Sequence, residues 1–250
     1  MNVIEIRDVS KAFGGVVANR AVSLDVPRGR ITGLIGPNGS GKTTLFSSIV
    51  GQHPIDSGSI RLEGREISRL GVQQIARLGL QRTFQQTRIF SKMDCVQNLL
   101  VSLPHREERW THMFRRYPRD LVERAERLLE FVGLYPKRRL VAGSLSFGQQ
   151  KLLEFAMALM NEPKVLLLDE PTAGMNPQET GEFTTFVGRL REEVGLTVLL
   201  IEHDMRVVMG VSDRVTVLDY GEKIAEGTPE AIQKDERVIE AYLGTAAVSS

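Results

Sequence analysis

Hydrophobic and polar residues alternate along three segments near the start of the chain. These are residues 3–9, 22–26 and 59–63, the last of which follows the turn Asp56-Ser57-Gly58. Alternation turns one face of a strand towards a core and the other towards water, as in a half-solvated antiparallel sheet. The pattern therefore predicts a small antiparallel β layer in the N-terminal region.

Further along, the apolar runs are continuous rather than alternating. Such runs occupy residues 31–35, 164–169, 196–202 and 214–219, and the later ones are separated by stretches with helical spacing. Continuous runs are typical of strands that are buried on both faces of a parallel sheet. We therefore expect an α/β fold with a parallel sheet at its core.

Between these regions, the stretch 91–144 has apolar residues at helical spacing. One helix face would carry Leu121, Val122, Ala125, Leu128, Leu129 and Val132. This spacing predicts an inserted helical subdomain. The predicted organisation is a single domain of residues 1–250, in which 1–90 and 145–250 form a catalytic core with the β layer and 91–144 form the helical subdomain.

Composition limits the classes of partner. The 250 residues carry a formal net charge of +1, which implies no strong attraction to nucleic acid, so we expect no nucleic-acid partner. Cys95 is the only cysteine, which excludes an intrachain disulfide and a cysteine-based metal site. The longest apolar runs, such as 198–201, are far shorter than the roughly 20 residues of a membrane span, so membrane association would need a partner protein.

A glycine-rich loop follows the first continuous apolar run. It reads Gly-Pro-Asn-Gly-Ser-Gly-Lys-Thr over residues 36–43 and precedes a helical stretch. Glycines let successive backbone N–H groups converge on a phosphate, which also favours the positive end of a helix. Lys42 is suited to the β- and γ-phosphates of a nucleotide, and the Thr43 hydroxyl is suited to Mg²⁺.

The alternative is a glycine-rich turn that binds no ligand. The predicted nucleotide-binding residues of this loop are Gly36, Pro37, Asn38, Gly39, Ser40, Gly41, Lys42, Thr43 and Thr44.

Two carboxylates end the apolar run 165–168. Asp169 and Glu170 are expected at the carboxyl end of a strand, where ligands bind in open α/β sheets. We expect Asp169 to hold Mg²⁺ through water and Glu170 to act as general base on the attacking water. The alternative is a strand that simply ends in two solvated acids.

The segment Leu145-Ser146-Phe147-Gly148-Gln149 has two compatible interpretations. Ser146 and Gln149 have the spacing of a helix capping box, and a helical apolar pattern follows them. The N-terminus of such a helix also suits a phosphate. The segment therefore predicts a helix start that is either a cap alone or a cap that also contacts phosphate.

Taken together and in this order, these motifs resemble the ATP-binding cassette family of transporter ATPases, over essentially the whole chain. Residues 145–149 resemble the family's LSGGQ signature, with Phe147 where glycine is commonest, and 165–170 resemble its Walker B strand. The resemblance implies a P-loop NTPase fold with a RecA-like parallel sheet core, an N-terminal antiparallel β subdomain and an inserted α-helical subdomain. It also implies ATP hydrolysis with ATP and Mg²⁺ as ligands.

The resemblance assigns further residues. Phe13 resembles the aromatic residue that stacks on adenine, although a packed aromatic at a strand end is the alternative. Gln85 resembles the glutamine that senses Mg²⁺ and the attacking water, and His203 resembles the histidine that contacts the γ-phosphate; both have structural alternatives. Gly174 and Asn176 lie in the segment that resembles the D-loop, where Asn176 replaces the usual aspartate.

Family geometry implies two cassettes packed head to tail. Each ATP would lie between Lys42 of one subunit and Ser146, Phe147, Gly148 and Gln149 of the other. ATP would favour the closed dimer, and hydrolysis would let it reopen. The second cassette is either a copy of this chain or a paralogue.

Segments such as 13–15, 171–177 and 238–244 resemble ATPases of branched-chain amino acid importers, and lipopolysaccharide-export ATPases share a similar tail. This resemblance implies transmembrane permease subunits, a periplasmic or extracellular solute-binding protein that acts through them, and a peripheral location on the cytoplasmic face of the inner membrane. A soluble cassette ATPase and a kinase or GTPase are the competing classes. The chain lacks the Asn-Lys-x-Asp motif that reads guanine in GTPases, which argues against the last of these classes.

The stretch 105–119 is rich in arginine and aromatic residues. Such residues suit an interface, so we expect the permease to dock near it. A solvated loop of the insert is the alternative.

Overall fold

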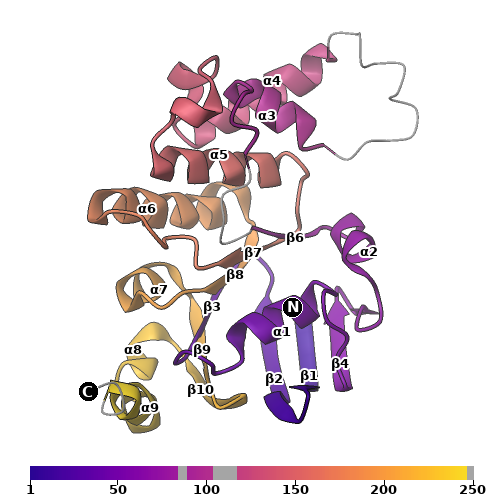
Figure 1. Ribbon diagram of the computed structural model, residues 1–250, viewed down its shortest axis with the longest axis vertical. Helices are drawn as coiled ribbons and strands as arrows, with labels where there is room; N and C mark the ends of the chain where they lie inside the picture. Colours follow the sequence, from indigo (N-terminus) through magenta and orange to yellow (C-terminus); the bar gives the residue numbers. More distant parts are fainter. Residues whose placement is uncertain (84–88, 104–116, 247–250) are drawn as a thin grey trace. The chain divides into compact units, whose positions relative to one another are not determined.

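The computed structural model describes residues 1–83, 89–103 and 117–246 (Figure 1). The chain divides into two compact units. The first unit consists of residues 1–82, 164–172 and 187–250, and the second unit consists of residues 83–163 and 173–186. The second unit therefore includes more of the chain than the stretch 91–144, because it also contains the helical segments within residues 145–163 and 173–186.

A six-stranded sheet forms the centre of the first unit. Its strand order is β10-β9-β3-β8-β7-β6, and all neighbours are parallel except β9 and β10. The strands are β3 (Ile31–Ile35), β6 (Leu80–Arg82), β7 (Val165–Asp169), β8 (Thr197–Ile201), β9 (Arg214–Asp219) and β10 (Glu222–Gly227). Every residue of β3, β7 and β8 is buried, which confirms the parallel sheet predicted from the continuous apolar runs.

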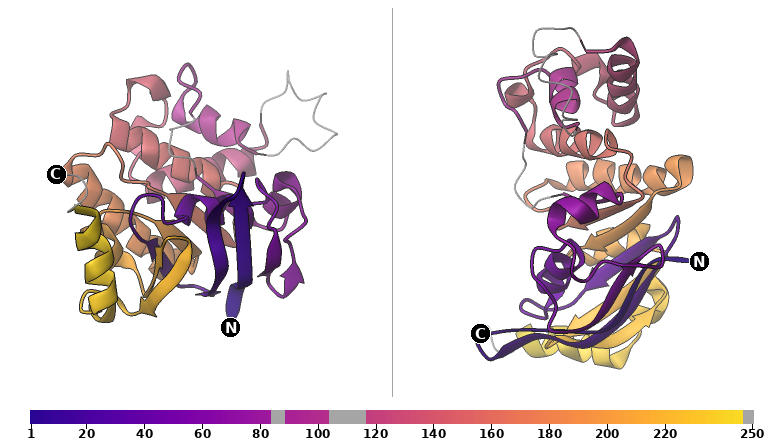
Figure 2. Two further views of the ribbon diagram at one scale, coloured as in Figure 1. Left: turned by 60° about the horizontal axis from the view of Figure 1, so that its bottom comes forward. Right: turned by 90° about the vertical axis from the view of Figure 1, so that its right-hand side faces the viewer.

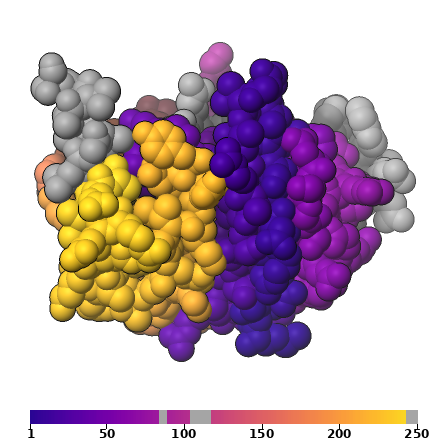
Figure 3. Space-filling model, turned by 90° about the horizontal axis from the view of Figure 1, so that it is seen from below, coloured from indigo at the N-terminus to yellow at the C-terminus, as the bar shows by residue number. Residues whose placement is uncertain are grey.

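The second sheet of this unit is antiparallel, as the alternating segments predict. Its order is β2-β1-β4-β5, with β1 (Asn2–Phe13), β2 (Val16–Pro27), β4 (Ser57–Leu62) and β5 (Arg65–Glu66). The two long strands lie side by side in both views of Figure 2. Seen from below, β1 and β2 lie between the C-terminal residues and the β4 region (Figure 3). A hydrogen bond from the Arg20 N–H of β2 to the Gly221 carbonyl oxygen, at 2.8 Å, connects β2 to the turn between β9 and β10.

One hydrophobic core joins both sheets of the first unit to helix α1 (Lys42–Ile49). Its members include Ile4 and Ile6 of β1, Leu34 of β3 and Phe46 of α1, all fully buried. The other helices of this unit are α2 (Val72–Arg77), α7 (Met205–Val211), α8 (Pro229–Ile232), α9 (Glu236–Ala246) and the end of α6 (Pro177–Val194). The loop before α1 is thus fixed between two sheets.

Helices build the second unit. They are α3 (Cys95–Val101), α4 (Arg119–Phe131), the short turns Tyr135–Lys137 and Ala142–Ser144, α5 (Phe147–Leu159) and the start of α6. Ala125 and Leu129 of α4 are fully buried, in agreement with the helix face predicted from the sequence. Phe155 of α5 packs against Phe183 of α6 with ring centroids 5.0 Å apart. Of the helices described, none has both the length and the apolarity needed to cross a membrane.

Asn98 of α3 binds the backbone of the segment that precedes this helix. Its side chain is fully buried and donates to the carbonyl oxygens of Phe90, Met93 and Asp94 at 2.9–3.3 Å. Its Oδ1 accepts from the Phe90 N–H at 2.7 Å. This one side chain therefore satisfies the backbone of the segment that leads from residue 90 into α3.

We predict that Asn98→Leu destabilises the second unit by about 2–4 kcal/mol, because several buried backbone groups lose their partner at once. Urea unfolding followed by circular dichroism measures the loss, and hydrogen exchange of the α3 amides locates it. The control is Ser102→Ala, which removes a hydroxyl that donates to the Leu99 carbonyl oxygen at 2.7 Å, together with its weaker 3.2 Å contact to Met157. A loss for Asn98→Leu no larger than that of the control contradicts the prediction.

Candidate functional site

The loop of residues 36–41 connects β3 to α1 and packs directly on backbone atoms. A Cβ atom on Gly36 would lie 2.0 Å from the Leu218 carbonyl oxygen, and one on Gly41 would lie 2.1 Å from the Ala18 carbonyl oxygen. Both glycines have positive φ, 148° and 95°. The Asn19 side-chain amide adds a hydrogen bond to the Gly41 carbonyl oxygen at 3.1 Å. Only glycine permits this approach, so packing by itself requires glycine at both positions.

The tip of the loop is different. Gly39 also has a positive φ of 81°, but a Cβ atom there would meet nothing within 4 Å. Asn38 and Gly39 are exposed, whereas Pro37 and Ser40 are buried. The loop therefore has a fixed base and an exposed tip. It leads into the N-terminus of α1, and the first backbone N–H groups of a helix have no partner within the helix.

Lys42 is the first residue of α1 and is only 7% exposed. Its ammonium group donates to the carbonyl oxygens of Gly36 and Pro37, both at 2.8 Å. Burial lowers the pKa of Lys42, and the charges of Glu170 and Asp169 act in the opposite direction. The structure thus brings the predicted lysine and the two predicted acids into one electrostatic neighbourhood.

Asp169 ends β7 and forms an ion pair that the sequence reading missed. The Arg82 guanidinium lies 2.5 Å from the Asp169 carboxylate, and both side chains are largely buried. Arg82 also donates to Gln52 Oε1 at 2.7 Å and to Ser47 Oγ at 3.3 Å. The contact arises because β6 pairs with β7, a neighbourhood that residues 87 positions apart in the chain do not reveal locally.

Glu170 follows β7 in a left-handed conformation with a φ of 46°. Its N–H donates to the Ile201 carbonyl oxygen of β8 at 2.9 Å. For a residue other than glycine, this conformation costs free energy and persists only where the surroundings enforce it. The chain therefore turns sharply at the predicted general base.

His203 lies just beyond β8, the neighbouring strand, and its side chain is 63% exposed. The residue before it, Glu202, is fully buried and accepts hydrogen bonds from the backbone N–H groups of Thr172 and His203. The predicted histidine thus lies at the same edge of the sheet as Asp169 and Glu170. Sequence reading assigned nothing to Glu202.

Phe13 ends β1 and is 44% exposed. Its ring meets His53 edge to face, with centroids 5.3 Å apart, and the Lys11 ammonium lies 5.2 Å from its centroid. Lys11 in turn pairs with Asp56 at 2.8 Å. An exposed aromatic face held in this way is available to a planar ligand. No sequence pattern pointed to Lys11 or His53.

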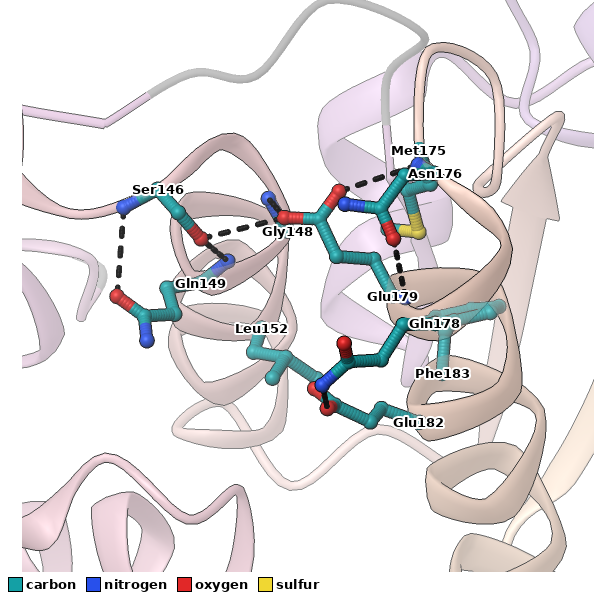
Figure 4. A pocket seen from close by; sticks show the side chains of 10 residues that line it. All are labelled: Ser146, Gly148, Gln149, Leu152, Met175, Asn176, Gln178, Glu179, Glu182 and Phe183. Atoms are coloured by element: carbon teal, nitrogen blue, oxygen red, sulfur yellow. Dashed lines mark hydrogen bonds between the residues drawn. The ribbon is translucent and has the colours of Figure 1, made fainter.

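In the second unit, Ser146 begins α5 with the predicted capping box. Its Oγ accepts from the Gln149 N–H at 3.4 Å, and Gln149 Oε1 accepts from the Ser146 N–H at 3.3 Å. A carboxylate that sequence reading missed also lies here (Figure 4): Glu179 of α6 accepts from Ser146 Oγ at 3.3 Å and from the Gly148 N–H at 3.1 Å. These residues line a hollow of about 220 Å³.

The close approach of Glu179 depends on Gly148. A Cβ atom at that position would lie 2.8 Å from the Glu179 carboxyl group. On the other side, the Asn176 N–H donates to Glu179 Oε2 at 3.2 Å, and Asn176 Oδ1 accepts from the Glu179 N–H at 3.0 Å. Asn176 thus caps α6, and α5 begins with an anion already beside its N-terminus.

Phe147, the residue that departs from the LSGGQ pattern, is 42% exposed. Its ring lies 3.3 Å from the place that a Cβ atom on Gly174 would take, and Gly174 has a φ of 82°. The absence of a side chain at Gly174 therefore leaves room for the aromatic ring. Phe147 and Gly174, singled out separately in the sequence, belong to one packing contact.

Two predicted features fall outside the described residues. Gln85 does so entirely, and of the stretch 105–119 only residues 117–119 are described. Among the described residues, no group of three or more His, Cys, Asp or Glu side chains could hold a metal ion. The available donors, the Thr43 hydroxyl and the Asp169 carboxylate, are the oxygen ligands that Mg²⁺ prefers when it keeps waters and phosphate oxygens as its other ligands. The donor set fits Mg²⁺ bound together with a nucleotide.

Known proteins resemble this chain over its whole length. Residues 19–173 match the family described as ABC transporter, and residues 222–248 match the one described as branched-chain amino acid ATP-binding cassette transporter. The chain is 43% identical to the high-affinity branched-chain amino acid transport ATP-binding protein BraF of Pseudomonas aeruginosa, with 98% of each chain covered. It is 40% identical to the protein LivG of Escherichia coli K12, named for the same transport, again with 98% of each chain covered.

Solved structures agree. A nucleotide-free ATP-binding cassette from an ABC transporter is 33% identical and gives a TM-score of 0.85, with 97% of this chain and 99% of the other covered. The ADP conformation of such a cassette gives 0.86 at the same identity, with 98% and 99% covered.

The two kinds of glycine in the loop make a matched pair. We predict that Gly41→Ala destabilises the protein by about 3–5 kcal/mol, because the new methyl group overlaps the Ala18 carbonyl oxygen and the backbone is left-handed. Gly39→Ala carries only the backbone strain and should lose about 1–2 kcal/mol. Urea unfolding midpoints of the two variants provide the comparison. Equal losses would show that the base of the loop is not packed as described.

Proposed function

Since this chain belongs to the ABC transporter family, we propose that it powers the import of branched-chain, hydrophobic amino acids. It is an ATP-binding subunit that hydrolyses ATP. The observation that carries the hydrolysis is the neighbourhood of Lys42, Asp169 and Glu170 at one edge of the parallel sheet. The cargo is inferred from the transport named for BraF and LivG and from the match of residues 222–248.

The proposed roles follow from the chemistry of each group. The N–H groups of the loop and of α1, together with Lys42, bind the β- and γ-phosphates, and Phe13 stacks on adenine. Mg²⁺, when bound, neutralises phosphate charge, and we assign Thr43 and Asp169 to it. Glu170 accepts the proton of the attacking water, and His203 contacts the γ-phosphate. Gln85 keeps the role that the sequence predicts.

We further propose that the two units form a single nucleotide-binding domain. Its second unit would present Ser146, Phe147, Gly148 and Gln149 to an ATP held by a second cassette, and Gly174 and Asn176 would lie at the same interface. A helix N-terminus with a serine hydroxyl suits a terminal phosphate. The working assembly is then a dimer in which each chain contributes one half of each site.

Permease subunits and a solute-binding protein complete the proposed importer, with this chain peripheral on the cytoplasmic face of the membrane. The relatives are named for transport, which favours this function over a soluble cassette ATPase and over lipopolysaccharide export. The test is co-purification with a multi-span membrane protein, followed by ATP-dependent uptake of leucine into vesicles that contain the complex. A complex that hydrolyses ATP but transports no branched-chain amino acid would refute the cargo alone.

The dimer makes a prediction for Glu170→Gln. The amide cannot accept the proton from water, so turnover should fall by about 100-fold or more, while ATP-bound dimers should accumulate. Turnover is measured by phosphate release and dimerisation by light scattering with and without MgATP. In the wild type, the rate per chain should fall on dilution below the dimerisation range. A constant rate, or a Glu170→Gln variant that stays monomeric with ATP, argues against paired sites.

Glu179 makes a second prediction for the same dimer. Its carboxylate accepts from Ser146 and Gly148, so a phosphate bound to these residues would lie close to it. Two like charges about 4 Å apart in water repel by about 1 kcal/mol. Glu179→Gln should therefore lower the ATP concentration for half-maximal dimerisation by about 5-fold, measured in the Glu170→Gln background. The matched control is Glu182→Gln, which lines the same hollow and bonds to Gln178 instead. An unchanged or higher ATP requirement for Glu179→Gln contradicts the prediction.

A further inference from the structure

Glu202 is a fully buried acid for which the proposed chemistry has no use. It directly follows β8 and precedes His203. A buried carboxylate is tolerated only when hydrogen bonds stabilise its charge. The hydrogen-bond partners of this carboxylate therefore indicate its role.

Its two oxygens face different segments of the chain. Oε1 accepts from the Thr172 N–H at 2.9 Å and from the Thr172 hydroxyl at 2.5 Å. Oε2 accepts from the His203 N–H at 3.0 Å and from the Asp204 N–H at 3.4 Å. Four donors thus converge on one carboxylate, which bridges the segment after β7 to the segment after β8.

These two segments carry the proposed general base and the proposed γ-phosphate contact. Thr172 lies two residues after Glu170, and His203 is itself one of the donors. The strand ends are already paired, because Asp169 lies opposite Ile201 and the Glu170 N–H donates to the Ile201 carbonyl oxygen. In addition to that bond, the Glu202 carboxylate links the two segments through the hydrogen bonds just described.

We propose that Glu202 is a positioning residue that holds Glu170 and His203 in one fixed relation through the backbone on either side of them. This inference rests on the proposed ATP hydrolysis. The carboxylate touches neither the nucleotide nor the water in this scheme. Its effect on turnover comes from the placement of two groups that act on the same phosphate, and a displacement of about 1 Å at such a site can cost about 100-fold in rate.

The requirement for a carboxylate is specific. Glutamine has the same shape, but it offers one oxygen and one NH₂ group to a site that holds four donors. Whichever way the amide turns, its NH₂ group faces a backbone N–H donor, that of Thr172 or that of His203, and this hydrogen bond is lost. Aspartate keeps the charge, but it is one methylene shorter and reaches only one of the two segments.

The experiment compares Glu202→Gln with wild type and measures kcat, KM for ATP, and the Kd of a fluorescent ATP analogue with Mg²⁺. We expect kcat to fall by about 100-fold, whereas KM and Kd change by less than about 3-fold, because the phosphate-binding loop is untouched. A merely structural carboxylate would lower the unfolding midpoint and leave kcat of the folded protein unchanged.

Asp213→Asn is the matched control. Asp213 also accepts a backbone hydrogen bond, from the Ile31 N–H at 2.8 Å, and pairs with Arg30 and Arg191. It directly precedes β9 and lies beside the first residue of β3, at the amino ends of these strands, whereas His203 lies beyond the carboxyl end of β8. This variant should lose stability and keep the wild-type kcat.

Thr172→Val provides a second variant in case Glu202→Gln does not fold. It removes only the hydroxyl donor and should lower kcat by about 5-fold with little change in Kd, since the N–H donor remains. Combined with Glu202→Gln, it should lower kcat no further, because the two changes break the same bridge.

A kcat within about 3-fold of wild type for Glu202→Gln, or for Thr172→Val if the former does not fold, overturns the inference and leaves ATP hydrolysis intact. Wild-type protein that fails to hydrolyse ATP even with its permease overturns the proposed function itself. The two failures are therefore separate observations.

Discussion

The close contact between the glycine loop and backbone carbonyl groups is the constraint on which the site depends. Gly41 lies against Ala18 of β2, and Gly36 lies against Leu218 of β9. The loop therefore joins the antiparallel sheet to the parallel sheet, and the Gly221 N–H closes the same junction by donating to the Ser40 carbonyl oxygen at 3.1 Å. Because backbone atoms make these contacts, the N-terminus of α1 is placed by the fold itself rather than by adjustable side chains.

Charge balance is the second consequence of that placement. Asp169 and Glu170 leave the sheet next to Lys42, and Arg82 adds a buried guanidinium to Asp169. Two carboxylates and two cationic side chains thus share a region from which water is partly excluded. Interactions between charges are stronger there than in solvent. A triphosphate would add negative charge to this region and Mg²⁺ would add positive charge. The two ions together would therefore disturb the charge balance less than either ion alone.

The sequence was sufficient for those features that follow from local pattern. Continuous apolar runs predicted β3, β7 and β8, and the spacing of Ser146 and Gln149 predicted the start of α5. What it could not provide were contacts between distant segments, such as Arg82 with Asp169 or Glu179 with Gly148. Nothing in the neighbourhood of Glu202 marks it as buried, because the pairing of β7 with β8 creates its environment. The polar edge strand β10 was missed for a related reason: only one of its six residues is buried, so the strand gives little apolar signal.

The start of α5 shows how such distant contacts alter function. The N–H groups of a helix N-terminus attract anions because they lack partners. Here the Gln149 N–H has the Ser146 hydroxyl and the Gly148 N–H has the Glu179 carboxylate, so both donors are already satisfied within the unit. A phosphate that arrives there exchanges one charged acceptor for another. The net gain of such an exchange is small, so in the proposed dimer the second cassette would have to add binding free energy from elsewhere on its surface before the pair closes.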